Sequence, residues 1–98
     1  MKQDIFDKYV ERICKRFKIS EEQLFTKTKK TDIVDARHLL YFLCYNRPMK
    51  LITIQNYMEE KGYTINHSSV VYGIGSIQTK SEDDRDYKKI IKEIEQSI

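Results

Sequence analysis

The sequence has few of the residues that interrupt helices. Its 98 residues include three glycines and one proline, and long periodic apolar stretches lie between them. This scarcity favours helices over a fold of strands and tight turns. We therefore expect an all-α fold, a compact domain of five to six helices that spans residues 1–98, because a chain of this length builds a single core.

Cysteine and histidine are equally scarce, with two of each. Cys14 and Cys44 lie on apolar helix faces, where a small buried thiol is common, and two cysteines make neither a disulfide framework nor a zinc pattern. His38 and His67 lie far apart in the sequence and have no metal-ligand spacing to either cysteine. We expect no metal and no cofactor.

Long apolar runs and catalytic motifs are absent too. No run approaches the length of a membrane span, and the first residues lead into a charged amphipathic pattern rather than a signal sequence. We expect a soluble cytoplasmic protein with no membrane partner. Since no nucleophile, base and orienting acid occur at motif spacing, we expect neither an enzyme nor a small-molecule substrate.

The net charge of +3 is unevenly distributed. Residues 1–50 carry 12 Lys/Arg against 7 Asp/Glu, whereas residues 51–98 carry 6 against 8. A basic half suits contact with phosphate, although surface lysines also occur as ordinary solubilising residues.

Apolar spacing and capping residues predict the positions of the helices. In chain order they are residues 4–17, a short helix capped by Ser20 and Gln23, residues 33–45 capped by Asp32, a helix from Leu51 closed by Gly62, one opened by Asn66 and one opened by Ser81. Residues 33–45 are apolar on nearly every side, which predicts a central helix that Pro48 ends.

Two segments are candidates for binding. Residues 26–31 (TKTKKT) have no apolar anchor and predict an exposed basic loop. Residues 64–79 (TINHSSVVYGIGSIQT) contain no Lys, Arg, Asp or Glu, although 34% of the chain is charged. A helix that enters the DNA major groove begins with side chains that offer donors and acceptors without bulk or charge repulsion. Residues 66–69 meet that requirement, although Asn66 and Ser68 could instead only cap a helix with His67 on its surface.

From Val10 to Ile77 the chain resembles the C-terminal DNA-binding domain of the bacterial replication initiator DnaA. The resemblance is carried, in order, by the segments KRFKI, SEEQLFTKTKK, IVDARHLLYFL, LITI and NHSSVVYGIGSI. The last is similar to the family signature, in which an acidic residue, a histidine and two hydroxyl residues open the recognition helix. The resemblance implies a helix-turn-helix of the Trp-repressor type. It also implies base contacts from Asn66, His67, Ser68 and Ser69.

The resemblance assigns the basic residues to the DNA backbone or minor groove. Lys27, Lys29 and Lys30 lie in the segment similar to the family's basic loop, and Lys50 is a further expected backbone contact. Because lysine is a hydrated point charge rather than a planar fork, we expect these residues to neutralise phosphates more than to insert into the groove. A merely solvated loop is the alternative.

Arg37 corresponds to a family position that contacts the DNA backbone. It reaches a phosphate or, alternatively, forms a structural ion pair with Asp32 or Asp35. Gly73 and Gly75 each cost a helix about 1 kcal/mol relative to alanine, so we expect close helix packing to compensate at both positions.

The chain departs from the family pattern at three points. Asn66 stands where the family has aspartate, and its amide adds donors that alter base preference. The turn through residues 59–65 is longer than the family's glycine-rich turn. A phosphate-binding glycine loop is absent, so we do not expect an ATP-driven initiator.

These features predict sequence-specific binding of double-stranded DNA in replication or transcription control. A chain that carries this domain without an ATPase domain suits a phage or mobile-element protein. The alternative is a protein-interaction module, or an antagonist that binds a host replication or transcription protein, for which Glu82, Asp83, Asp84 and Asp86 provide an acidic surface.

Overall fold

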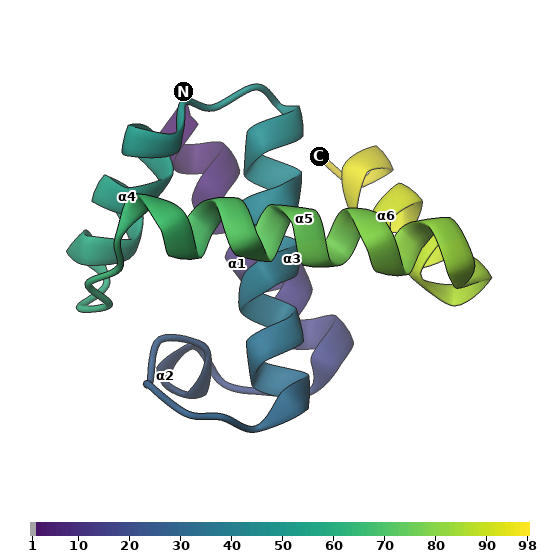
Figure 1. Cartoon of the computed structure of the whole chain (residues 1–98), viewed down its shortest axis with the longest axis horizontal. Helices are drawn as coiled ribbons and strands as arrows, with labels where there is room; N and C mark the ends of the chain where they lie inside the picture. Colours follow the sequence, from purple (N-terminus) through teal and green to yellow (C-terminus); the bar gives the residue numbers. More distant parts are fainter. Residues whose placement is uncertain (1) are drawn as a thin grey trace.

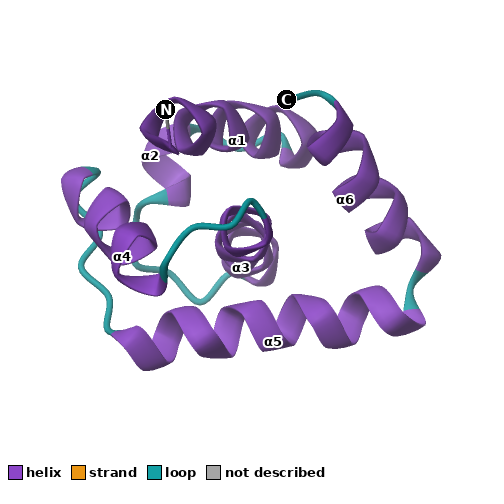
Figure 2. Cartoon of the chain, turned by 90° about the horizontal axis from the view of Figure 1, so that it is seen from above, coloured by secondary structure: helices purple, strands orange, loops and turns teal. Residues whose placement is uncertain are grey.

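The computed structural model describes residues 2–98, which form six α-helices and no strand. The helices are α1 (Lys2–Phe17), α2 (Glu21–Leu24), α3 (Thr31–Asn46), α4 (Leu51–Glu60), α5 (His67–Asp83) and α6 (Arg85–Gln96). Seen from above, α3 runs through the middle of the molecule, with α1, α4, α5 and α6 around it (Figure 2). The predictions of an all-α domain and of a central helix over residues 33–45 are confirmed.

The core forms around α3. Its fully buried side chains include Ala36, Leu39, Leu40, Leu43 and Cys44. The amphipathic helix α1 contributes Phe6, Tyr9, Val10 and Ile13 to the same cluster. Each large apolar side chain buried in this way contributes about 1.5–3 kcal/mol, so the packing against α3 is the main source of stability.

The short helix α2 begins at the predicted capping box. The amide of Gln23 donates to the Ser20 hydroxyl at 3.0 Å, and the Ser20 amide donates to the Gln23 side chain at 2.8 Å. These two bonds satisfy amides that a four-residue helix would otherwise leave unpaired. They hold Leu24 in the core, where it is fully buried.

The start of α3 differs from the prediction. The helix begins at Thr31, its N-cap is Lys30, and no side chain caps it. Asp32 lies inside the first turn, where its carboxylate accepts a hydrogen bond from the Ile33 amide at 3.0 Å and where a negative charge interacts favourably with the helix dipole. The predicted end is confirmed, since Arg47 is the C-cap ahead of Pro48.

Gly62 closes α4 as predicted. Its φ of 86° is the left-handed conformation that glycine adopts at low cost. The Gly62 amide donates to the Glu59 carbonyl at 2.9 Å, and the Tyr63 amide donates to the Met58 carbonyl at 3.0 Å. This pair of bonds is a Schellman motif, and it directs the chain toward α5.

The predicted boundary between the last two helices is wrong. Helix α5 continues through Ser81 to Asp83, because the Ser81 hydroxyl donates back to the Gln78 carbonyl at 2.9 Å instead of opening a new helix. Asp84 is the N-cap of α6, and its carboxylate accepts from the Asp86 amide at 2.9 Å. Helix α6 packs against the core through an apolar stripe in which Ile91 and Ile94 are buried.

Helix α5 crosses α3 on the face turned toward the viewer in Figure 1. At the crossing, a Cβ atom on Gly73 would lie 2.8 Å from ring carbons of both His38 and Tyr41. Close packing therefore explains Gly73. The same explanation is wrong for Gly75, where an added Cβ would meet nothing within 4 Å.

The two cysteines lie in or beside the core, as expected. Cys44 is buried and Cys14 is partly buried, and both are free thiols. Burial raises the pKa of the Cys14 thiol to about 11, with a smaller effect from Glu21 in the same direction. A thiol with a raised pKa is a poor nucleophile at neutral pH. Among the helices of the described part, none has the length and apolar character needed to cross a membrane.

Candidate nucleic-acid interface

The first turn of α5 presents the four predicted base-contacting residues at the surface. Asn66, His67, Ser68 and Ser69 are all exposed. The Asn66 side-chain oxygen accepts a hydrogen bond from the Ser69 amide at 2.8 Å, so Asn66 is the N-cap of α5. The cap uses only the oxygen of this side chain, and the amide nitrogen keeps its donors for an external acceptor.

The predicted basic loop is residues 26–30, because Thr31 already belongs to α3. Two local hydrogen bonds shape the loop: the Thr26 hydroxyl donates to the Glu22 carbonyl at 2.6 Å, and the Lys30 amide donates to the Thr28 hydroxyl at 3.3 Å. The side chains of Lys27, Lys29 and Lys30 are exposed, and none forms an ion pair within residues 2–98. Their charge is available to an external anion.

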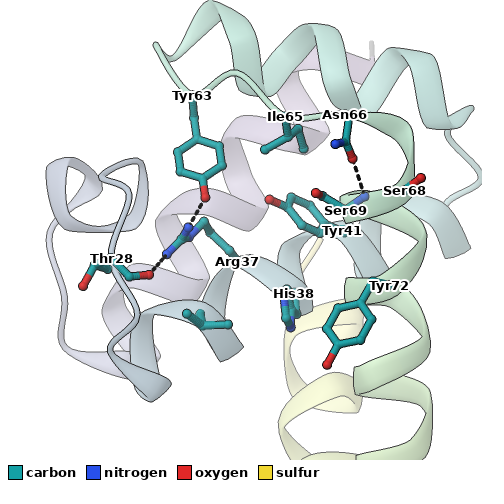
Figure 3. A pocket seen from close by; sticks show the side chains of 11 residues that line it. Thr28, Arg37, His38, Tyr41, Tyr63, Ile65, Asn66, Ser68, Ser69 and Tyr72 are labelled. Carbon is teal, nitrogen blue, oxygen red and sulfur yellow. Dashed lines mark hydrogen bonds between the residues drawn. The ribbon is translucent and has the colours of Figure 1, made fainter.

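A pocket of about 410 Å³ separates the basic loop from the start of α5. Thr28 lines it from the loop, Ser68 and Ser69 line it from α5, and Arg37 and Tyr41 line it from α3 (Figure 3). The fold thus brings together two segments that lie about forty residues apart in the sequence. The polar turn of α5 and the cationic loop lie on opposite sides of one depression.

Arg37 lies within this pocket and is only 4% exposed. One guanidinium nitrogen donates to the Tyr63 hydroxyl, and another donates to the Thr28 carbonyl at 3.2 Å. The guanidinium carbon also lies 4.7 Å from the centre of the Tyr63 ring. In this position a DNA phosphate would have to enter the pocket to reach Arg37.

The alternative proposed for Arg37, an ion pair with Asp32 or Asp35, is not found among residues 2–98. Asp35 instead pairs with Lys80, which joins α3 to the C-terminal half of α5. Arg37 has therefore neither of its predicted carboxylate partners. Its hydrogen bonds tie the basic loop to the turn that precedes α5.

Lys50 does not join this group. It is exposed and is the N-cap of α4, so it follows the C-terminal end of α3, whereas the basic loop precedes the N-terminal end. A helix of 16 residues is about 24 Å long, so Lys50 can contact a long duplex only at a point well removed from the loop.

Sequence reasoning missed the aromatic lining of the pocket. Tyr41 follows Arg37 by four residues on α3 and Tyr63 comes from the lengthened turn, while Tyr72, on α5, is 72% exposed. The spacing from Arg37 could have indicated Tyr41, because residues four apart share a helix face. Nothing in the sequence indicated that Tyr63 and Tyr72 line a site, apart from their location in the lengthened turn and in the charge-free segment.

His38 lies beside Tyr72 at the rim of the pocket. The two rings are 5.9 Å apart in an edge-to-face arrangement, and the His38 Nδ1 has no hydrogen-bond partner. Burial lowers the pKa of His38, the Asp35 carboxylate opposes this shift, and the cations Lys80 and Arg37 add to it. Burial also raises the pKa of Tyr41, so both groups are neutral at pH 7.

The site is thus a polar pocket without an acidic residue, located where α5 begins and flanked by a cationic loop. Among the residues that the structure describes, no group of three His, Cys, Asp or Glu side chains is placed to hold a metal. No protein-family model matches the chain, and a comparison with curated proteins found no similar sequence.

Proposed function

We propose that this protein binds double-stranded DNA in a sequence-specific manner, with α4 and α5 as a helix-turn-helix and α5 as its recognition helix. The observation that carries the proposal is the joint position of the basic loop and the first turn of α5 on either side of one pocket. Side chains that read bases and cations that contact phosphates have to lie on one surface for a duplex to meet both. The resemblance to the DnaA C-terminal domain supports the same assignment.

The chemistry of the first turn of α5 suits base recognition. Asn66 offers two amide donors, His67 offers a donor and an acceptor, and the Ser68 hydroxyl offers both. Side chains of this kind distinguish base pairs by their donor and acceptor patterns in the major groove. None of them is buried, so the fold does not use up this capacity.

The basic loop supplies attraction that does not depend on sequence. Lys27, Lys29 and Lys30 are exposed, and each phosphate that they neutralise releases counterions from the duplex. This contribution positions the protein along the DNA, whereas α5 selects the sequence. A role in replication or transcription control follows from such binding.

Selection of bound sequences from a random duplex pool tests the proposal. We expect enrichment of one short motif, and we expect the protein to bind the enriched duplex at least about a thousandfold more tightly than unrelated duplex, as specific DNA-binding proteins do. The Asn66→Ala, His67→Ala, Ser68→Ala variant, which keeps the basic loop, is the matched control. Recovery of the same unenriched pool by both proteins would refute sequence-specific binding.

A second candidate function is docking of another protein on α5. It is favoured by two exposed apolar side chains on this helix, Val71 at 48% and Tyr72 at 72%. Exposed acidic side chains, Glu82, Asp83, Asp84 and Asp86, lie at the junction of α5 and α6. In the pool selection this candidate predicts no enriched motif.

A further inference from the structure

The charge of Arg37 is buried without an anion to balance it. Its side chain is 4% exposed, its two hydrogen-bond acceptors are a phenol and a carbonyl, and its Nε atom has no partner. No carboxylate within residues 2–98 forms an ion pair with it. Burying a cation without an anionic partner is costly, since hydrogen bonds to neutral groups and the contact with the Tyr63 ring replace only part of its hydration.

Tyr41 is a second polar group whose bonding capacity is unused. The side chain is 3% exposed, and the hydroxyl has no hydrogen-bond partner among the described residues. In Figure 3 this hydroxyl points into the pocket, toward the side where Arg37 and Tyr63 lie. The Tyr41 ring is buried but its hydroxyl faces the pocket, so Tyr41 is a donor directed at a position that the protein itself does not fill.

Further donors surround the same position. The Tyr63 hydroxyl accepts from Arg37 and keeps its own hydrogen for another acceptor. Ser69 lines the opposite wall, in the first turn of a helix of 17 residues whose N-terminus carries partial positive charge. No aspartate or glutamate lines the pocket. A cation and several hydroxyl donors without an acid form a site for an anion.

We propose that this pocket binds an oxyanion of the phosphate class, held by Arg37, Tyr41, Tyr63 and Ser69. A phosphate group offers several acceptor oxygens and the negative charge that Arg37 lacks. The group comes either from a free phosphate or from the backbone of a bound duplex. Only the second source rests on the proposed function, because free phosphate binding requires no DNA.

The first experiment uses the protein without DNA. Inorganic phosphate is titrated against chloride at constant ionic strength, and the backbone amide signals of Tyr41 and Ser69 are followed by NMR. We expect saturable shifts at both residues. Tyr41→Phe removes one hydroxyl that has no partner in the fold, and a hydrogen bond to a charged ligand accounts for about a tenfold change in Kd. Arg37→Met should abolish the binding.

The matched control is Lys89→Ala, which removes one exposed positive charge from α6, outside the pocket. Its phosphate Kd should equal that of the parent protein, because general charge attraction alone does not form the site. If Arg37→Met unfolds, the Tyr41→Phe and Lys89→Ala pair still decides the question. Equal Kd values for these two variants, or no saturation below about 10 mM phosphate, would overturn a site for the free anion.

The second experiment distinguishes the two sources. If a duplex phosphate occupies the pocket, Tyr41→Phe weakens binding of duplex by about tenfold, and free phosphate competes with DNA. If the ligand is a free anion only, Tyr41→Phe leaves duplex affinity unchanged while weakening binding of free phosphate. The proposal is refuted if Tyr41→Phe changes neither affinity. Failure of the protein to bind any duplex would refute the proposed function and leave the first experiment valid.

Discussion

Over residues 67–79, both the buried and the exposed face of α5 lack charged side chains, but burial explains that lack only for the inner face. Val70, Gly73 and Ile77 are buried beneath this helix. Val71 follows Val70 and precedes Gly73 by two residues, about 200° around the helix, and it is exposed. Tyr72 lies at the flank between the two faces, where it lines the pocket beside His38. Burial excludes charge from the inner face, whereas an exposed face in a protein that is 34% charged is under no such constraint. The proposed function accounts for the uncharged exposed face as a surface that meets a binding partner.

The largest expected effect is a difference in the free energy of unfolding between a variant of the inner face of α5 and a variant of its outer face. Ile77→Ala removes a fully buried side chain and should lower the free energy of unfolding by about 2–5 kcal/mol. Val71→Ala, on the outer face, should change it by less than about 0.5 kcal/mol. Urea unfolding followed by circular dichroism measures both. Similar decreases in the two variants would mean that the outer face is also part of the core.

Gly73 and Gly75 allow the same comparison between a packed and an open position of α5, with smaller expected effects on stability. Gly73→Ala places a methyl group against the rings of His38 and Tyr41, and overpacking of this kind costs about 1–3 kcal/mol. Gly75→Ala meets no neighbour and should raise stability by up to about 1 kcal/mol, because alanine favours the helix. The difference in melting temperature tests this pair. A stabilised Gly73→Ala variant would contradict the described helix crossing.

The basic loop should contribute to affinity without contributing to selectivity. Replacing Lys27, Lys29 and Lys30 with alanine should reduce the slope of log K against log salt by about 0.9 for every phosphate that the loop neutralises in the parent protein. Lys89→Ala on α6, which removes an exposed positive charge outside the loop, serves as the control. Fluorescence anisotropy at several salt concentrations gives the slope. A triple variant with the parent slope would remove the loop from the interface.

The smallest effect concerns His38 and pH. Because burial lowers the pKa of His38 below its ordinary value of 6.5, the unfolded chain binds the proton more readily than the folded protein does. Neutral His38 therefore makes its full contribution to the free energy of unfolding above pH 6.5, and this contribution is lost as the pH falls through the lowered pKa. His38→Gln should show a flatter fall in melting temperature between about pH 7.5 and 5 than the parent protein. An unchanged pH dependence would show that His38 takes up its proton equally well in both states.

Local capping chemistry made much of the fold predictable. The capping box at Ser20, the Asn66 cap and the left-handed Gly62 all lie where the sequence indicates them, because each depends on residues within one turn. The prediction that the last helix starts at Ser81 was wrong for a related reason. A serine that hydrogen-bonds to its own helix and one that caps a new helix look alike in sequence.

The site was less predictable because it depends on contacts between distant segments. The four polar residues at the start of α5 were recognisable from their composition. The burial of Arg37 was not, since it results from the Tyr63 hydroxyl and the Thr28 carbonyl, which lie 26 and 9 residues away along the chain. No periodic pattern in the sequence encodes such a pairing.

The most direct test of the account measures sequence preference after changes to the first turn of α5. On the duplex enriched by selection, His67→Ala and Ser68→Ala should each lose about 1–3 kcal/mol of binding free energy. Binding to unrelated duplex should stay the same, because the basic loop is intact. Circular dichroism confirms that each variant is folded. A folded double variant that keeps the full preference for the selected sequence would contradict the assignment of α5 as the recognition helix.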